Sequence, residues 1–138
     1  MSGGSTPEYD GGARCPCLSG EVFGDCCGKV HADRAAGGPG AVTAEAHMRS
    51  RYSAFVVGNV DYLLDSWHPS TRPEMLELDP EMAWRRLDIV DTVDGGPFDD
   101  AGIVEFAAHY RSGGERGVQR ERSSFVREGG RWYYVDAL

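Results

Sequence analysis

The sequence has little lysine, no long apolar run, and no cysteine outside one short stretch. Only Lys29 among its fourteen basic residues is a lysine, and its formal net charge is −8. The excess acid lies in residues 74–105, which hold ten acidic and two basic side chains. Such a chain repels phosphate backbones, so a nucleic-acid partner is not expected. No apolar stretch approaches the roughly 20 residues of a membrane-spanning helix, so no span is expected either.

The first twelve residues are polar and rich in glycine, and they lack the apolar stretch of a secretion signal. This predicts a cytoplasmic protein whose thiols stay reduced. A chain of 138 residues accommodates one ordinary domain and a small appendage. We expect a disordered lead-in at residues 1–13, a cysteine module at 14–34, a flexible linker at 35–42 and a folded domain at 43–138.

All four cysteines lie within thirteen residues, where one closely spaced pair is followed by a second after eight residues. They are Cys15, Cys17, Cys26 and Cys27. Four thiolates offered to one point suit Zn²⁺, which binds four ligands in a tetrahedron with Zn–S distances of about 2.3 Å. A full set of protein ligands leaves no position for water, so such a zinc is structural. His31 is an alternative fourth ligand if the adjacent Cys26 and Cys27 do not both reach the ion.

Two other fates of these thiols compete with zinc. Four cysteines form two disulfides in any of three pairings, but disulfides rarely persist in a reducing cytosol. Free thiols would instead suit a redox-sensing protein, which requires that no metal is bound.

The stretch CPCLSGEVFGDCC resembles the SEC-C motif, the small zinc-binding tail of the SecA translocation ATPase. The spacing of the cysteines and the internal Ser-Gly both agree with that motif. The resemblance implies a zinc module that docks on a protein or ribosomal partner. This copy has Leu18 where the motif usually has glycine, and Glu21 and Asp25 where it usually has lysine.

Behind the module, apolar spacing predicts helices. Thr43 is placed to cap a helix that Gly58 ends, and its apolar residues recur at i, i+4, i+7 and i+8 from Met48. A shorter helix is predicted from Asn59 to the His68-Pro69 boundary, and the pair Asp79-Pro80 predicts the start of a third.

From Trp84 onward the apolar period changes to two. Gly-containing turns separate four predicted strands, near residues 84–93, 103–111, 118–127 and 132–137. Helices followed by a strand meander indicate an α+β fold, with the helices packed on one face of an antiparallel sheet.

The stretch MRSRYSAFVVGNVDYLLDSWHPSTRP resembles the signature of the YchJ-like bacterial family. In that family a SEC-C motif precedes a domain of the nuclear-transport-factor-two-like (NTF2-like) superfamily. The resemblance extends from Cys15 to the last predicted strand. It implies a cone in which helices wrap a curved sheet, with a pocket at the mouth.

The polar and aromatic residues expected to line that pocket are Arg51, Tyr52, Trp67, His68, Glu105, His109 and Arg111. A catalytic role would make His68 or His109 a general base, with Tyr52 or an arginine stabilising an oxyanion. The ordinary alternatives are a helix-end cap for His68 and a solvated or sheet-packed position for His109.

Arg51 has two possible roles on the first predicted helix, an ion pair with a neighbouring aspartate or recognition of an acidic ligand. Trp132 and Tyr134 share one face of the last strand, which is a possible homodimer interface. The protein is expected to be a monomer or a homodimer.

Two functional hypotheses follow. In the first, a small cytosolic protein with a structural zinc acts as a docking module for a protein or ribosomal partner. In the second, an enzyme or binding protein holds a small molecule in the cone pocket, with isomerase-like or dehydratase-like general base chemistry as the catalytic form.

Overall fold

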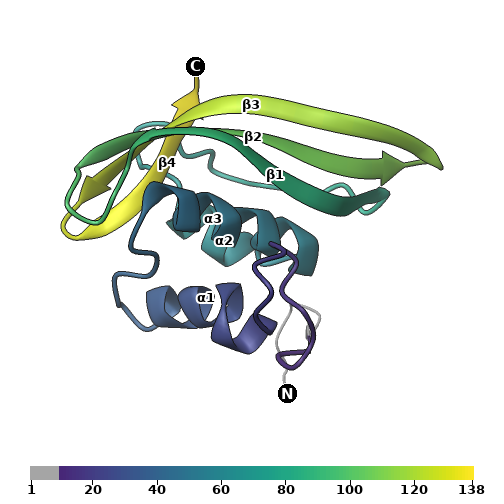
Figure 1. Cartoon of the computed structure of the whole chain (residues 1–138), viewed down its shortest axis with the longest axis horizontal. Coiled ribbons are helices and arrows are strands. Elements are labelled where there is room, and N and C mark those ends of the chain that lie inside the picture. Colours follow the sequence, from purple (N-terminus) through teal and green to yellow (C-terminus); the bar gives the residue numbers. More distant parts are fainter. Residues whose placement is uncertain (1–9) are drawn as a thin grey trace.

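A computed structural model describes residues 10–138, and residues 1–9 of the predicted lead-in lie outside the described part of the chain. A four-stranded sheet curves over the helices, which all lie on one of its faces (Figure 1). The α+β fold predicted from the sequence is confirmed. In chain order the elements are the 3-10 helix η1 (Phe23–Asp25), helices α1 (Cys27–Ala35), α2 (Ala44–Val57) and α3 (Val60–Asp65), and strands β1 (Met82–Asp94), β2 (Ala101–Ser112), β3 (Glu115–Glu128) and β4 (Arg131–Ala137).

The sheet is a simple meander. Its spatial order is β1-β2-β3-β4, and every neighbouring pair is antiparallel. Register shifts interrupt β1 twice and the β3–β4 pairing once. Such bulges bend a strand and increase its twist, which accounts for the curvature seen in Figure 1.

The two helices predicted after the cysteine module form as expected. Thr43 Oγ1 accepts the backbone N–H of Ala46 at 3.0 Å at the start of α2, and Gly58 ends that helix with a φ of 76°. Asn59 Oδ1 accepts the N–H of Tyr62 at 3.0 Å, which caps α3. Each cap satisfies a backbone group that the first or last helical turn leaves without a partner.

The prediction of a helix after Asp79-Pro80 is wrong. Residues 80–81 form a turn, in which Asp79 Oδ1 accepts the N–H of Glu81 at 2.9 Å, and β1 begins at Met82. A capping aspartate followed by proline suits a tight turn as well as a helix start. The remaining helix is instead α1, inside the cysteine module.

The main core lies between α2 and the sheet. Met48 and Tyr52 of α2 are buried against Val104, Phe106 and Ala108, which alternate along β2 and face the helices. Trp132 is 0% exposed, and its Nε1 donates to the carbonyl of Val42 at 3.0 Å. It is therefore not available for the dimer interface predicted from the sequence.

Helix α2 is covered on a second side as well. His47, Ser50, Arg51 and Ser53 are all buried on this helix, although none belongs to its apolar stripe. Helices α1 and α3 contact α2, and α1 lies farthest from the sheet (Figure 1). The cysteine module thus forms an outer layer that covers a polar surface of the central helix. No helix within residues 10–138 is long and apolar enough to cross a membrane.

Candidate functional site

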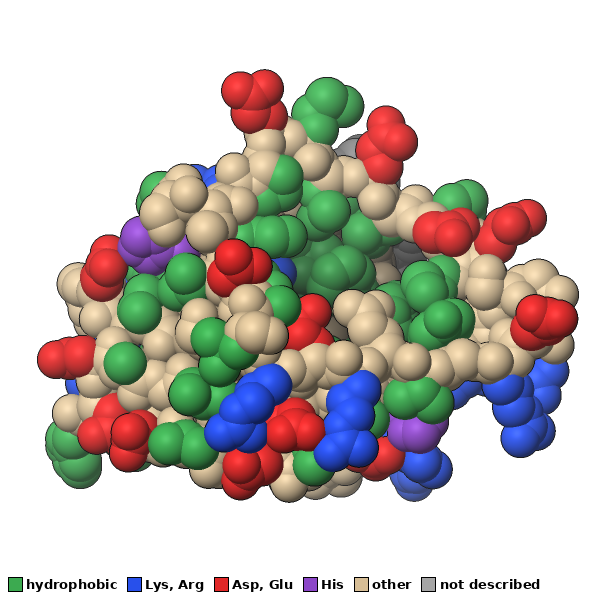
Figure 2. All heavy atoms as spheres, turned by 90° about the horizontal axis from the view of Figure 1, so that it is seen from above, with side chains coloured by type: hydrophobic (Ala, Val, Ile, Leu, Met, Phe, Trp, Pro, Cys, Tyr) green, Lys and Arg blue, Asp and Glu red, His purple; other side chains and the backbone are tan. Residues whose placement is uncertain are grey.

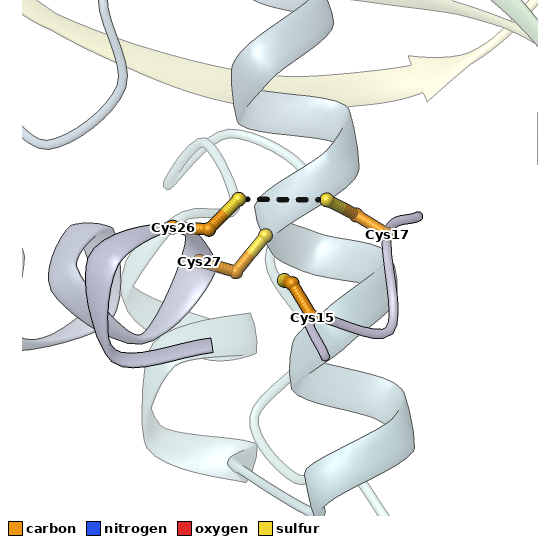
Figure 3. Close-up of side chains that lie close together, drawn as sticks. All are labelled: Cys15, Cys17, Cys26 and Cys27. Carbon is orange, nitrogen blue, oxygen red and sulfur yellow. Dashed lines mark hydrogen bonds between the residues drawn. The ribbon is translucent and has the colours of Figure 1, made fainter. Parts of the chain in front are cut away.

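The four cysteine side chains point toward one another at the boundary between the N-terminal loop and α1 (Figure 3). Their sulfur atoms all lie within 4.8 Å of one another, and Cys17 Sγ lies 3.6 Å from Cys26 Sγ. Cys15, Cys17 and Cys27 are buried, and Cys26 is half-buried. The cluster is therefore enclosed by protein, with one sulfur nearest to the surface.

Short local contacts bring the four residues together. The N–H of Cys15 donates to the carbonyl of Glu21 at 2.9 Å, and a bridge joins Arg14 to Val22, so the loop closes on itself. Leu18 bends the loop with a φ of 63°, in the left-handed region that favours glycine. Helix η1 then returns the chain, and α1 begins at Cys27.

The sulfur geometry fits a tetrahedral metal ion. Four sulfurs at about 2.3 Å from zinc lie about 3.8 Å from one another, close to the 3.6 Å between Cys17 Sγ and Cys26 Sγ. A disulfide requires about 2.05 Å, and all four cysteines are free. His31 is not in this group, because its Nε2 lies 2.8 Å from the carbonyl oxygen of Ser50 and its ring packs on Tyr62. The cysteines thus form a closed four-sulfur site.

Without a cation, the same cluster is unfavourable as four thiolates. Hydrogen bonds from Cys17 and Cys27 lower the pKa of Cys15, whereas hydrogen bonds with Cys15 and Cys17 raise the pKa of Cys27. Burial raises the pKa of Cys26. Without a cation, ionisation of one sulfur therefore opposes ionisation of the others. A divalent metal would remove that conflict by neutralising the thiolates.

Groups on α2 surround the cluster. Cys15 Sγ lies 3.6 Å from Ser53 Oγ, and Cys27 Sγ donates to the carbonyl of Arg49 at 3.6 Å. Arg49 Nη1 in turn donates to the carbonyl of Cys17 at 3.0 Å. Such outer contacts orient metal ligands, and here they also join the module to the central helix.

Arg34 provides a second attachment, at the far end of α1. Its side chain is 1% exposed, and its Nε donates to Asp65 Oδ2 at 2.8 Å. Its Nη1 donates to the carbonyl of Trp132 at 2.7 Å, and the guanidinium lies over the ring of Tyr133. The helix that begins with a metal-ligand candidate therefore ends against α3 and β4.

A separate cavity of about 390 Å³ opens between the sheet, α2 and the loop before β1. We call it the aromatic pocket. Figure 2 shows it as a hollow in which hydrophobic side chains gather, with acidic side chains along its rim. Its aromatic lining consists of Tyr52, Phe55, Trp67, Trp84, Phe106 and Tyr134. Its polar lining consists of Arg51, Glu77, Asp79, Gln119 and Glu121.

Arg51 is the buried cation of this pocket, and it is only 3% exposed. Its Nη1 donates to the carbonyl of Leu63 at 2.9 Å and to Ser66 Oγ at 2.7 Å. The guanidinium carbon lies 5.1 Å from the ring centre of Trp67 and 4.6 Å from that of Tyr134. Burial lowers the pKa of Arg51 to about 10, so the side chain is still positively charged at neutral pH.

Arg51 makes no ion pair within residues 10–138. Glu121, the pocket carboxylate whose charge raises the pKa of Arg51, is held by other groups. Tyr134 Oη donates to Glu121 Oε2 at 2.9 Å, and Ser123 Oγ donates to the same oxygen. Nε1 of Trp67, which also lines the pocket, is buried without a hydrogen-bond partner. The pocket thus contains one buried donor, Trp67 Nε1, that no protein acceptor satisfies.

The structure separates the residues expected to share this pocket. Arg51, Tyr52 and Trp67 line it. Burial raises the pKa of Tyr52 to about 12, so its hydroxyl remains protonated. His68, Glu105, His109 and Arg111 are not among the lining residues.

Glu105, His109 and Arg111 lie on the outer face of β2. The residues between them, Val104, Phe106 and Ala108, face inward. Glu105 pairs with Arg120 and Arg122, and His109 pairs with Asp88.

His68 follows shortly after α3, and its backbone N–H donates to the carbonyl of Tyr134 in β4 at 2.7 Å. Its Nδ1 lies 2.7 Å from Ser70 Oγ, and its Nε2 lies 3.1 Å from both carboxylate oxygens of Glu128. The assignment of the ring nitrogens is the reverse of that in serine hydrolases, where the serine contacts Nε2 and the carboxylate contacts Nδ1. None of the three residues lines the aromatic pocket.

Sequence reasoning missed a buried polar group under α1. Ser50 Oγ donates to the carbonyl of His47 at 2.6 Å and lies 2.5 Å from Tyr62 Oη. His47 is fully buried, and its Nε2 donates to the carbonyl of Ser66 at 3.2 Å. A signal was present, since His47, Ser50 and Arg51 recur at i, i+3 and i+4, which is the spacing of a second helix face.

Both the cysteine module and the domain that follows it match known protein families. The family model described as the YchJ middle NTF2-like domain matches residues 43–137, and the SEC-C motif matches residues 13–29. A UPF0225 protein of Corynebacterium efficiens is 50% identical over 126 residues, which cover 91% of this chain and 93% of the relative. A UPF0225 protein of Streptomyces coelicolor is 51% identical over 122 residues, with coverage of 88% and 92%.

Two solved structures resemble the fold. The solution structure of a SEC-C motif containing protein from Rhodopseudomonas palustris has a TM-score of 0.74 at 32% identity, and the match covers 90% of this chain and 96% of that one. The crystal structure of a SEC-C motif containing protein from Psychrobacter arcticus also has a TM-score of 0.74, at 26% identity, with coverage of 88% and 80%.

Proposed function

This chain belongs to the YchJ family, and we propose that it is a cytoplasmic binding protein. Its zinc is structural, and its aromatic pocket holds a small anionic molecule. The observation that carries the proposal is Arg51, a cation 3% exposed in an otherwise mostly apolar pocket without an ion-pair partner among the described residues. Glu121 raises the pKa of Arg51 without forming an ion pair with it, so the buried charge is only partly compensated, and an incompletely paired buried charge is costly. A ligand carboxylate would compensate it.

The size and composition of the pocket support a small organic ligand. Its volume of about 390 Å³ falls within the range of roughly 300–1,000 Å³ of small-molecule sites. An apolar wall with few polar groups is the usual composition of such sites, in which the polar groups fix the orientation of the ligand. The ligand class is therefore an aliphatic or aromatic acid, whose carboxylate contacts Arg51 and whose apolar part contacts the rings.

No histidine lines this pocket, so the histidine general base considered from the sequence has no substrate within reach. The proposal is accordingly binding rather than isomerase or dehydratase chemistry.

Ligand preference is tested with three probes that have the same alkyl chain and differ in head group: octanoate, octanol and octylamine. Because Trp67 and Trp84 line the pocket, tryptophan fluorescence reports occupancy. Octanoate should bind more tightly than the other two, and Arg51→Met should remove that preference. The control Arg120→Met changes an exposed arginine on the outer face and should leave the preference intact. Equal binding of acid and alcohol by the unmodified protein would overturn the proposal.

Zinc as the structural metal is supported by the four sulfur ligands, their spacing and their burial. The test is native mass spectrometry of untagged protein purified without added metal, where one zinc per chain is expected. Replacement by Co²⁺ should give the absorption of a tetrahedral sulfur site. Cys26→Ser should lower metal retention, and Ser19→Ala, which removes only a hydroxyl 3.1 Å from Cys26 Sγ, should not. Protein that is fully folded and metal-free would refute a structural zinc.

A docking role for the cysteine module is a second candidate, and one observation favours it. Leu18 is 48% exposed and adopts a left-handed φ, and Val22 on the same loop is also exposed. An apolar side chain held outward at a strained position suits a contact with a partner. The test is co-sedimentation of zinc-loaded protein with ribosomes. Leu18→Ser with Val22→Ser should abolish it without loss of metal, and failure of the unmodified protein to co-sediment would remove a ribosomal partner.

A further inference from the structure

A second hollow, beside the β2–β3 turn, concentrates positive charge in an acidic protein, and Arg86, His109, Arg111 and Arg116 belong to the face of the sheet away from the helices. Its volume is about 440 Å³, and we call it the basic hollow. The residues that define it are Arg85, Arg86, His109, Tyr110, Arg111 and Arg116. Basic side chains gather at the lower right of the face shown in Figure 2, beside a histidine. Among residues 10–138, no acidic side chain lines the hollow.

The sheet register accounts for this gathering. Arg111 of β2 lies directly opposite Arg116 of β3, and Arg86 of β1 lies opposite His109. The register shift between Trp84 and Arg86 leaves Arg85 as an additional residue, which also lines the hollow. Three neighbouring strands therefore place arginines around one depression.

The charges in the hollow are poorly compensated. Within the described part of the chain, Arg85, Arg111 and Arg116 make no ion pair, whereas Arg86 pairs with Asp88 at 3.2 Å. Yet the whole sequence has 22 acidic and 14 basic residues, so carboxylates are abundant elsewhere. Like charges directly opposite each other on neighbouring strands are destabilising. The Arg111–Arg116 pair thus lowers stability in isolation, and an anion bound between the two strands would reverse that effect.

We propose that the basic hollow binds a compact polyphosphate group. Several guanidinium groups around one depression suit an anion with several charges and many acceptor oxygens, and planar guanidinium forks match phosphate geometry. A long nucleic acid fits less well, because β1 places Asp88 and Asp91 close by on the same outer face and the net charge is −8. The polyphosphate is either inorganic or the phosphate chain of a nucleotide.

The test is calorimetric titration of the zinc-loaded full chain with tripolyphosphate at physiological ionic strength. Saturable one-to-one binding is expected. Arg111→Gln and Arg116→Gln should each weaken it by about tenfold, as expected for a lost charge-assisted hydrogen bond. Arg131→Gln, which removes an arginine outside the hollow, is the matched control and should leave the affinity unchanged.

A stability measurement separates binding from a structural role. Without the anion, Arg116→Gln should be at least as stable as the unmodified protein, because it removes a like-charge contact. Stability lost together with affinity would indicate a structural arginine and overturn the proposal. Tighter binding of ATP than of tripolyphosphate would identify a nucleotide, and equal affinities would identify the inorganic anion. No saturable binding of tripolyphosphate, or tighter binding of a single-stranded RNA, would refute a compact polyphosphate site.

Discussion

Arg34 should hold the cysteine module and the NTF2-like domain together, so that the two unfold as one cooperative unit. Its buried guanidinium contacts Asp65, the carbonyl of Trp132 and the ring of Tyr133. Arg34→Ala would leave the Trp132 carbonyl buried without a partner, which costs about 2 kcal/mol. Loss of the contact with Tyr133 adds about 0.5 kcal/mol. Asp65 is 48% exposed and regains water, so loss of its pair adds only about 0.5 kcal/mol.

The expected loss is therefore about 3 kcal/mol in the free energy of unfolding, which is large for one side chain. The measurement is urea denaturation at fixed metal concentration, because bound metal shifts apparent stability. Tryptophan fluorescence reports on the domain, and Co²⁺–thiolate absorption reports on the module. Both signals should change in a single transition, and Arg34→Ala should move them together.

The matched control is Asp65→Asn, which keeps the Trp132 contact of Arg34 and removes only the half-exposed charge pair. It should cost no more than about 1 kcal/mol. A variant Arg34→Ala in which only the metal signal shifts, with the fluorescence transition unchanged, would refute the reasoning. The module would then be an independent tail.

Two further predictions concern the core. Burial lowers the pKa of His47 well below its usual value, so the folded state keeps this ring neutral while the unfolded state protonates below about pH 6.5. Stability should thus fall as the pH drops below about 6.5, by up to about 1.4 kcal/mol per pH unit for this group, and urea midpoints of His47→Gln should depend less steeply on pH. Separately, a Cβ at Gly102 would lie 2.5 Å from Gly95 Cα. Gly102→Ala should cost about 1–3 kcal/mol, and Gly96→Ala, with its nearest contact at 3.3 Å to the flexible side chain of Asp99, should cost much less by thermal denaturation.

The features predicted best from the sequence are those that depend on residues close together in the chain. Residues 15–27 place four sulfurs within one loop, and the structure brings all four together. The strand alternation from Trp84 and the caps at Thr43 and Asn59 are equally local, and the strands and both helices form near the predicted residues. Helix α1 was missed because Cys27–Ala35 has no apolar stripe. Its burial comes from His31 and Arg34, whose contacts lie on α2, α3 and β4.

The pocket was harder to predict because alternation identifies two faces of a strand without showing which one is hollow. Glu105 and His109 share the outer face of β2, so they lie across the sheet from Arg51. Arg51 was recognised as a candidate, but its burial was not expected. An apolar stripe assumes one covered side of a helix, whereas α2 is covered on two sides.

That double coverage connects the two proposed sites. On α2, Arg49 and Ser53 contact the cysteine cluster, whereas Arg51 and Tyr52 line the aromatic pocket. The positions alternate along less than two turns of one helix, and a helical segment of this length moves as a unit. A metal that fixes the cysteines would therefore also fix the helix that presents Arg51 to the pocket. Because coupling between two sites is reciprocal, a ligand that orders Arg51 should strengthen metal retention by the same factor as the metal strengthens ligand binding. Such coupling would make the SEC-C module a support for the pocket.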